Sequence, residues 1–159
     1  MLAITGASDG IGAEVARAAV ADGWRVVLAA RRRELLDALA DELGGSAHAV
    51  AVTADVTEWD DVQTIPEAAL SAFGRLDAVL ANAGFGATRG FLNESPEFWK
   101  SMVLTNVYGA ALTLRACIPA LTEAKGHVML MGSVSGRQVG TGSLYSCTKW
   151  AVTAMAEAA

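Results

Sequence analysis

The eight residues TGASDGIG, positions 5–12, stand between two runs of different character. The apolar run MLAIT (1–5) predicts a short β-strand, and the Ala-rich run GIGAEVARAAVADG (10–23) predicts a helix that stops at Gly23. Glycine suits a tight turn between them, because it allows unusual backbone angles and lets another group approach closely. A helix N-terminus behind such a turn offers free N–H groups and a positive dipole end to an anion. The stretch therefore predicts a dinucleotide-binding strand–turn–helix unit.

After this unit the chain alternates apolar, β-like runs with helical segments, which predicts βαβ units and a parallel sheet. The run WRVVLAA (24–30) shows no polar alternation, as expected for a strand buried on both faces. We expect an α/β fold, namely a Rossmann-like doubly wound parallel sheet with helices on both faces, in one domain over residues 1–159. The further expected strands are 48–56, 76–84 and 127–133, and the further expected helices are 32–45, 58–73, 95–125 and 145–159.

Local patterns sharpen three of these expectations. Leu35, Leu39 and Leu43 at i, i+4 and i+8 predict one apolar helical stripe. Pro66 is expected to kink its helix or to begin its second half. The pair Ser95–Pro96 predicts an N-cap followed by proline at the first helical position.

The composition restricts the class of partner. With 53% hydrophobic and 18% charged residues, a folded core is expected rather than disorder. The balance of 12 basic to 17 acidic residues argues against nucleic acid or an anionic membrane, so the expected partner is a small molecule. Cys117 and Cys147 lack metal-type spacing, so we expect two buried, reduced thiols and no metal site. Together with the lack of a signal-peptide pattern, this predicts a cytoplasmic protein.

The glycine spacing carries a family resemblance. With Gly6-x-x-x-Gly10-x-Gly12 in the pattern T-G-x-x-x-G-I-G, the sequence resembles the short-chain dehydrogenase/reductase family of the compact, single-domain type. Asp55-Val56 after the third expected strand and NAG (82–84) after the fourth match further family elements. The resemblance implies that the following residues bind the cofactor: Thr5, Gly6, Ser8, Gly10, Ile11, Gly12, Arg31, Asp55, Val56, Asn82, Ala83, Gly84, Tyr145 and Lys149.

The end of the second expected strand indicates which dinucleotide binds. A carboxylate there would bind the ribose 2′-hydroxyl of NAD, whereas a cation accommodates the 2′-phosphate of NADP. The strand ends without an acid and runs into the arginines 31–33, of which Arg31 would contact the phosphate by resemblance. Asp9 in the glycine turn opposes NADP, because its carboxylate would repel the phosphate unless the arginines held it off. We expect NADP, with NAD as the less favoured alternative.

Tyr145 and Lys149 stand four residues apart in an expected helix, so both side chains can point at one pocket. Reducing a carbonyl with hydride from a nicotinamide requires a proton donor for the forming alkoxide. Tyrosine can donate, but at a pKa of about 10 it is a poor base for the reverse direction. A nearby ammonium group favours the phenolate and so lowers that pKa. The pair therefore predicts a general acid/base.

By resemblance, two further residues complete a catalytic set. Ser133, at the end of the fifth expected strand, would polarise the carbonyl oxygen, and Asn106 would hold a water that links the lysine to solvent. Tyr108 is expected only to pack. The loop from Ser133 to Tyr145 is one residue shorter than in many members, so we expect the turn at residues 140–142 to tighten.

The expected function is an NADP(H)-dependent oxidoreductase that interconverts a carbonyl and an alcohol, as a homodimer or homotetramer. Two alternatives remain open: a non-catalytic NAD(P)-binding regulator or inactive fragment, and an epimerase or dehydratase of the extended type. The resemblance also implies a sixth strand with a Pro-Gly turn, a substrate loop and a seventh strand beyond Ala159. On this basis the chain is expected to be a fragment that lacks these C-terminal strands, with an exposed edge on its fifth strand.

Overall fold

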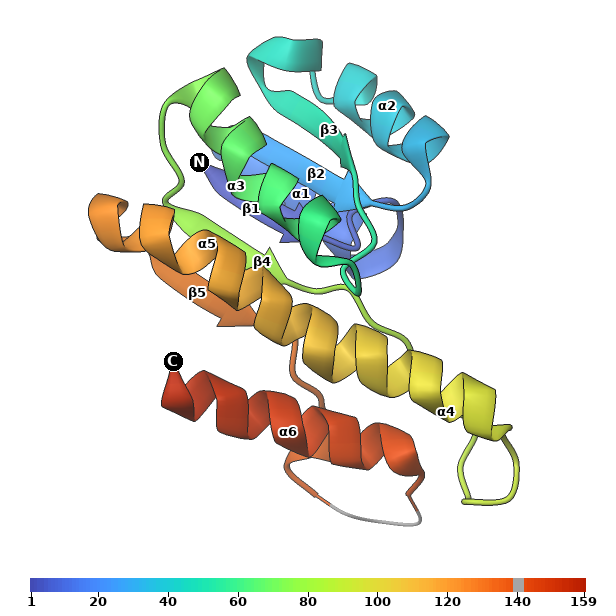
Figure 1. Ribbon diagram of the computed structural model, residues 1–159. Helices are drawn as coiled ribbons and strands as arrows, with labels where there is room; N and C mark the ends of the chain where they lie inside the picture. The colour runs from blue at the N-terminus through green and yellow to red at the C-terminus, as the bar shows by residue number, and fades with distance from the viewer. Residues whose placement is uncertain (139–141) are drawn as a thin grey trace.

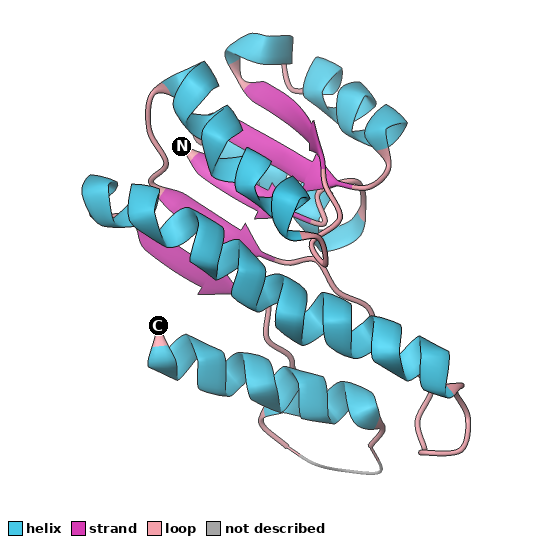
Figure 2. Cartoon of the chain, viewed as in Figure 1, coloured by secondary structure: helices cyan, strands magenta, loops and turns pink. Residues whose placement is uncertain are grey.

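A computed structural model describes residues 1–138 and 142–159 of the chain. Five parallel strands form one sheet in the order β3-β2-β1-β4-β5, and all their arrows point the same way in Figure 2. Because β2 and β4 lie on opposite sides of β1, the strand order reverses there, and ligands of open α/β sheets bind at such a switch point. The strands are β1 (Leu2–Thr5), β2 (Val26–Ala30), β3 (Ala49–Thr53), β4 (Ala78–Ala81) and β5 (His127–Leu130).

Helices cover both faces of the sheet, which confirms the expected α/β class. Three consecutive helical elements, α4, η2 and α5, form one long helix that crosses the sheet, and α6 lies alongside it (Figure 1). The α-helices are α1 (Gly10–Ala21), α2 (Arg33–Glu42), α3 (Trp59–Phe73), α4 (Pro96–Val103), α5 (Ala110–Ala124) and α6 (Leu144–Ala158). The short elements are the 3₁₀ turns η1 (Gly45–Ala47) and η3 (Val134–Gly136) and the π-helical η2 (Leu104–Gly109).

The core consists of two layers, because successive side chains of a strand point to opposite faces. Ile4 of β1 belongs to the layer beneath α1 and α2, together with Leu36. Ala3, one residue earlier, belongs to the layer beneath α3 and α5, together with Ile65 and Leu121. Both faces of β1 are therefore buried, which explains why its sequence does not alternate between apolar and polar residues.

The apolar stripe of α2 differs from the expected one. Leu35 is 42% exposed, whereas Leu36, Leu39 and Ala40 are buried and Leu43 packs against them. The stripe therefore follows i, i+3, i+4 and i+7, the spacing of a broad apolar helix face, and the predicted i, i+4, i+8 spacing was wrong at its first member.

Three other local expectations have mixed outcomes. Ser95 is the N-cap of α4, and its Oγ accepts a hydrogen bond of 3.2 Å from the Phe98 N–H, as predicted. Pro66 does not begin a separate helix, since α3 runs through it. Cys117 is buried, but Cys147 is exposed, so that prediction was wrong for the second thiol. Cys147 lies on α6, which packs mainly against η3 and η2, and its side chain is on a part of that helix that these neighbours do not cover.

The strand β5 forms one edge of the sheet, since β4 is its only partner among the described residues. Its exposed His127 and Met129 contrast with the buried central strands, and the expected exposed edge is present.

The helix Pro96–Ala124 is long and apolar enough to cross a membrane by length and composition alone. Buried core helices pass the same test, and 44% of its most apolar window is buried inside the fold.

Candidate functional site

The turn after β1 is closed by glycine backbones. Gly6 and Gly10 have positive φ angles of 66° and 52°, which other residues rarely adopt. A Cβ at Gly12 would lie 2.3 Å from the Gly6 carbonyl oxygen, so no side chain fits there. The N-terminus of α1 is thereby held against the end of β1, and Gly10 and Ile11 of its first turn line the cleft at this end of the sheet.

A small set of hydrogen bonds fixes this turn to the end of β4. The Thr5 Oγ1 accepts hydrogen bonds from the backbone N–H groups of Asn82 (3.0 Å) and Ala83 (3.1 Å). In return, the Asn82 Nδ2 donates to the carbonyl oxygens of Thr5 (3.0 Å) and Gly6 (3.3 Å). Thr5 and Asn82 therefore join the two strands on either side of the switch point.

One cleft of about 630 Å³ lies along the carboxyl ends of the strands. Three of the predicted site residues, Thr5, Gly12 and Asn106, do not line it and act from behind its wall. The predicted residues that do line it are Gly6, Ser8, Gly10, Ile11, Arg31, Asp55, Val56, Asn82, Ala83, Gly84, Ser133, Tyr145 and Lys149. Residues that were not predicted as site residues also line it: Asp9, Ala30, Arg32, Ala54, Phe85, Gly86, Thr105, Met131 and Gly132.

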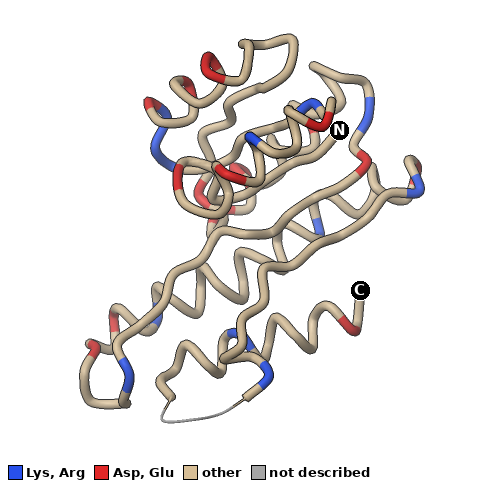
Figure 3. Tube along the Cα trace, turned by 180° about the vertical axis from the view of Figure 1, so that it is seen from behind, with Lys and Arg blue, Asp and Glu red and all other residues tan. Residues whose placement is uncertain are grey.

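Charged residues of both signs meet at the end of the cleft near β2. The Arg32 guanidinium lies 2.6 Å from the Asp9 carboxylate and donates a hydrogen bond of 2.8 Å to the Ser8 Oγ. The Arg31 guanidinium lies 3.8 Å from the Asp55 carboxylate. Figure 3 shows basic and acidic segments side by side where α2 begins. Asp9 was expected to repel a 2′-phosphate unless an arginine held its carboxylate, and Arg32 holds that carboxylate.

The Asp55 carboxylate is oriented by the turn that follows β3. Its Oδ1 accepts hydrogen bonds from the backbone N–H (3.0 Å) and the Oγ1 (2.9 Å) of Thr57, while Oδ2 faces Arg31. The Asp55 N–H in turn donates to the Asp61 carboxylate at 2.8 Å. This part of the cleft is thus fixed by local polar contacts before any ligand enters.

At the other end of the cleft, α6 presents Tyr145 and Lys149. Ser143 caps this helix, because its Oγ accepts a hydrogen bond of 3.3 Å from the Tyr145 N–H. The Lys149 Nζ donates to the Met131 carbonyl oxygen (2.7 Å) and lies 5.8 Å from the centre of the Tyr145 ring. Burial lowers the pKa of the Lys149 ammonium below its ordinary value. A buried cation thus lies beside the phenol ring.

Ser133 lies at the same end, where β5 leads into η3. Its Oγ accepts a hydrogen bond of 3.1 Å from the Ser135 N–H, as the N-cap of that turn. The hydroxyl hydrogen remains available for an acceptor in the cleft. The expected tightening at residues 140–142 involves positions 140 and 141, which lie outside the described residues. The carbonyl of Gly142, the third residue of that turn, accepts a 3.0 Å hydrogen bond from the Gly90 N–H.

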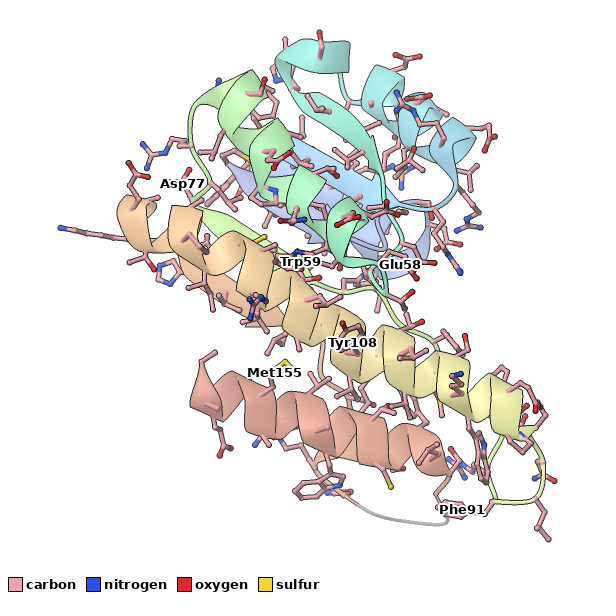
Figure 4. All side chains as sticks on the ribbon, viewed as in Figure 1. Glu58, Trp59, Asp77, Phe91, Tyr108 and Met155 are labelled. Carbon is pink, nitrogen blue, oxygen red and sulfur yellow. The ribbon has the colours of Figure 1, made fainter. Side chains whose placement is uncertain are left out.

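Asn106 is buried in the π-helical segment of the long helix. Its Oδ1 accepts from the Phe85 N–H (3.0 Å), and its Nδ2 donates to the Phe85 carbonyl (2.9 Å) and to the Thr148 Oγ1 (3.1 Å). The Thr148 Oγ1 donates to the Tyr145 carbonyl at 2.7 Å. Asn106 therefore connects the cleft wall to the helix of Tyr145. Neighbouring Tyr108 is 47% exposed on the long helix (Figure 4) and does not line the cleft, so the expectation that it only packs stays a prediction.

The arrangement fits an elongated anionic nucleotide. The glycine turn and the start of α1 suit a pyrophosphate, because free N–H groups and the helix dipole favour an anion there. The arginine end suits a ribose or its phosphate, and the Tyr145 end offers a phenol, an ammonium and a hydroxyl.

No group of three or more His, Cys, Asp or Glu side chains placed to hold a metal ion occurs within 1–138 and 142–159.

The chain is similar to known oxidoreductases over its whole length. The family described as short chain dehydrogenase matches residues 1–159. An uncharacterized oxidoreductase of Staphylococcus saprophyticus is 34% identical over 99% of this chain and 64% of the relative, so the chain spans less than two thirds of that relative's length.

Two crystal structures of related enzymes have a similar fold over almost the whole of this chain. A short-chain dehydrogenase/reductase of Burkholderia phymatum in complex with NAD has a TM-score of 0.90 and is 31% identical over 99% of this chain and 58% of its own. An alcohol dehydrogenase of Thermococcus sibiricus complexed with 5-hydroxy-NADP has a TM-score of 0.84 and is 33% identical over 99% and 68%.

Proposed function

This chain belongs to the short-chain dehydrogenase family, and on that basis we propose that the protein is a cytoplasmic oxidoreductase that interconverts a carbonyl and an alcohol with NADP(H). In this proposal residues 1–159 form one dinucleotide-binding domain. The observation that supports it is that the glycine turn and Ser133, Tyr145 and Lys149 line one and the same cleft. A nicotinamide dinucleotide supplies the hydride when bound, while the chain's own residues hold it and handle the proton.

Binding of the cofactor rests on the phosphate and adenosine ends of the cleft. The N–H groups at the start of α1 hold the pyrophosphate, and Arg31 binds the 2′-phosphate that distinguishes NADP from NAD. Asp55 and Val56 lie where the adenine is held in this proposal, with Asn82 fixing the turn beneath it. The arginines, and the lack of a carboxylate at the end of β2, support NADP over NAD.

Proton transfer is assigned to Tyr145, whose hydroxyl gives its proton to the carbonyl oxygen during reduction and takes it back during oxidation. The Lys149 ammonium lies 5.8 Å from the centre of the Tyr145 ring, so its charge stabilises negative charge that develops on the tyrosine oxygen. Ser133 donates a hydrogen bond to the same carbonyl oxygen. Asn106 and Thr148 are positioning residues, because they hold the backbone of α6 rather than reach into the cleft.

The exposed apolar residues of the long helix support a homo-oligomer as the working form. Val103, Leu104, Tyr108 and Ile118 are 37–47% exposed, and Trp150 on the adjacent α6 is 44% exposed. Apolar surface concentrated on two neighbouring helices is typical of a protein–protein contact. In this proposal the partner is a second copy of the same chain.

The test is Tyr145→Phe, with NADPH-dependent reduction of a panel of aldehydes and ketones as the assay. Loss of the proton donor is expected to lower kcat by about a hundredfold or more. The Kd for NADPH should stay nearly unchanged, since the phenyl ring remains. Tyr108→Phe is the matched control, because it removes the only other tyrosine hydroxyl, which lies outside the cleft.

Retained turnover in Tyr145→Phe would contradict the assigned mechanism. NADPH binding with no turnover over the whole panel in the unmodified protein would contradict the enzymatic proposal and favour a non-catalytic nucleotide-binding regulator.

A further inference from the structure

The Tyr145 end of the cleft contains little charge of its own. Among the described residues, the charged side chains that line the cleft are Asp9, Arg31, Arg32, Asp55 and Lys149. The first four form two ion pairs at the arginine end, so Lys149 is the charged residue beside Tyr145. Its ammonium is buried and already donates to the Met131 carbonyl oxygen at 2.7 Å. An anionic substrate would therefore lose its hydration at this end without gaining a free cation.

Phe85 forms an apolar wall at the same end. Its backbone is held by Asn106, which accepts from the Phe85 N–H at 3.0 Å and donates to the Phe85 carbonyl oxygen at 2.9 Å. Its ring packs edge-to-face on Phe98 of α4, with the ring centres 5.3 Å apart and the planes at 72°. Asn106 also donates to Thr148, on the helix of Tyr145. The backbone and the ring of Phe85 are thus both held in place relative to Tyr145.

Open space lies next to Phe85 and next to Ser133. Gly86 follows Phe85 and Gly132 precedes Ser133 in the chain, and both glycines line the cleft. A Cβ added at either glycine would meet no atom of the described residues within 4 Å. Phe85 is only partly buried, so some of its apolar surface stays open to the cleft. A carbonyl compound held by Ser133 and Tyr145 therefore has room for a substituent beside the Phe85 ring.

We propose that this end of the cleft takes an uncharged aldehyde or ketone with a flat apolar substituent, such as an aryl group, and that Phe85 is the specificity-determining residue that holds this substituent. The inference rests on the proposed function, because it places the carbonyl at Tyr145 and Ser133. An aromatic ring gains more against Phe85 than an aliphatic group of the same area, because two rings attract each other edge-to-face or offset. Phe98 is a positioning residue that acts through the Phe85 ring.

The experiment compares three aldehydes with the same reacting group: 3-phenylpropanal, 3-(4-carboxyphenyl)propanal and propanal. In the unmodified chain, kcat/KM with NADPH should be higher for 3-phenylpropanal than for the other two by about tenfold or more. Phe85→Leu keeps an apolar side chain and removes the ring. It should lower kcat/KM for 3-phenylpropanal by about two- to tenfold, the contribution of an aromatic pair, and leave propanal nearly unchanged. Phe98→Leu should act in the same direction with a smaller effect.

Phe91→Leu is the matched control. Phe91 packs on Trp99 with 5.7 Å between the ring centres, but it does not line the cleft, so its loss should leave the ratio of the phenyl substrate to propanal unchanged. A second readout needs no turnover: the Kd of 3-phenylpropan-1-ol, the alcohol product, measured by saturation-transfer NMR in the presence of NADP. This Kd should rise by about two- to tenfold in Phe85→Leu and stay constant in Phe91→Leu. Thermal melting verifies that each variant folds.

The inference is overturned if propanal or the carboxylated aldehyde is reduced as well as 3-phenylpropanal, although the proposed oxidoreductase would then still stand. It is also overturned if Phe85→Leu leaves the ratio unchanged or if Phe91→Leu lowers it equally. Alcohol binding that depends on Phe85, without turnover of any aldehyde, would support the inference about the cleft and contradict the proposed enzyme. A chain that shows neither turnover nor alcohol binding overturns both.

Discussion

Beside the glycine turn, every residue of the strands β1, β2 and β4 is buried, whereas on the side of the sheet nearer Tyr145 the edge strand β5 exposes His127 and Met129. The first region is held by strand pairing on both sides of β1 and by two apolar layers. The second depends largely on hydrogen bonds from side chains to backbone, such as Lys149 to Met131 and Thr153 to Gly136.

This difference shows that the two halves of one site are held in place by different forces. Burial in a close-packed core leaves little freedom, so the glycine turn cannot adjust when an atom is added. A typical hydrogen bond contributes only about 1 kcal/mol net, so α6 is held by several modest contacts and can shift with its neighbours. Nucleotide binding and proton transfer should therefore respond differently to equivalent substitutions.

Gly12→Ala tests the rigid half and has the largest expected effect. The added Cβ would lie 2.3 Å from the Gly6 carbonyl oxygen, and both backbones are fixed in the core. We expect a loss of about 2–3 kcal/mol in the free energy of unfolding, measured by urea denaturation, and loss of 5′-AMP binding. Gly86→Ala is the control for stability, because a Cβ there meets nothing within 4 Å. Equal effects of the two substitutions would refute a steric origin.

Gly136→Ala places an equivalent clash in the adjustable half. Its Cβ would lie 2.5 Å from the Lys149 carbonyl oxygen, which pushes η3 away from α6. Because this edge can shift, we expect a smaller loss of about 1–2 kcal/mol and nearly unchanged 5′-AMP binding. Gly132→Ala, whose added Cβ meets nothing within 4 Å, is the control for stability in the same region. If nucleotide binding were lost as well, the two halves would not be separable.

The two cysteines offer the mildest comparison, one in each region. Buried Cys117 should resist a thiol reagent in the native protein, while exposed Cys147 should react at once. Burial raises the pKa of the Cys117 thiol from 9.0 to about 12. Above pH 9 the unfolded thiol therefore loses its proton while the folded one keeps it, so this group makes stability fall as pH rises.

The measurement is the melting temperature of the unmodified chain and of Cys117→Ala between pH 7 and pH 10. The unmodified chain should lose more stability over this range, because Lys149 and all other titrating groups are present in both proteins and cancel. Parallel pH curves for the two proteins, or rapid reaction of both thiols, would show that Cys117 is not sealed in the core.

Most of the fold followed from patterns that are local in the sequence. Periodic apolar runs and glycine stops predicted the strands and helices, and the glycine turn indicated where a nucleotide would bind. Leu35 and Cys147 were predicted to be buried but are exposed. A sequence pattern shows that a helix is amphipathic, but it does not fix which side chains the neighbouring elements cover.

The sequence by itself determined the α/β class, the glycine turn and the presence of Tyr145 and Lys149 on one helix face, because these depend on residues close together in the chain. Only the tertiary structure decided that Arg32 meets Asp9 and that Asn106 forms hydrogen bonds with Phe85 and Thr148. These contacts join residues more than twenty positions apart. Their partners are chosen by how strands and helices pack, which no local pattern specifies.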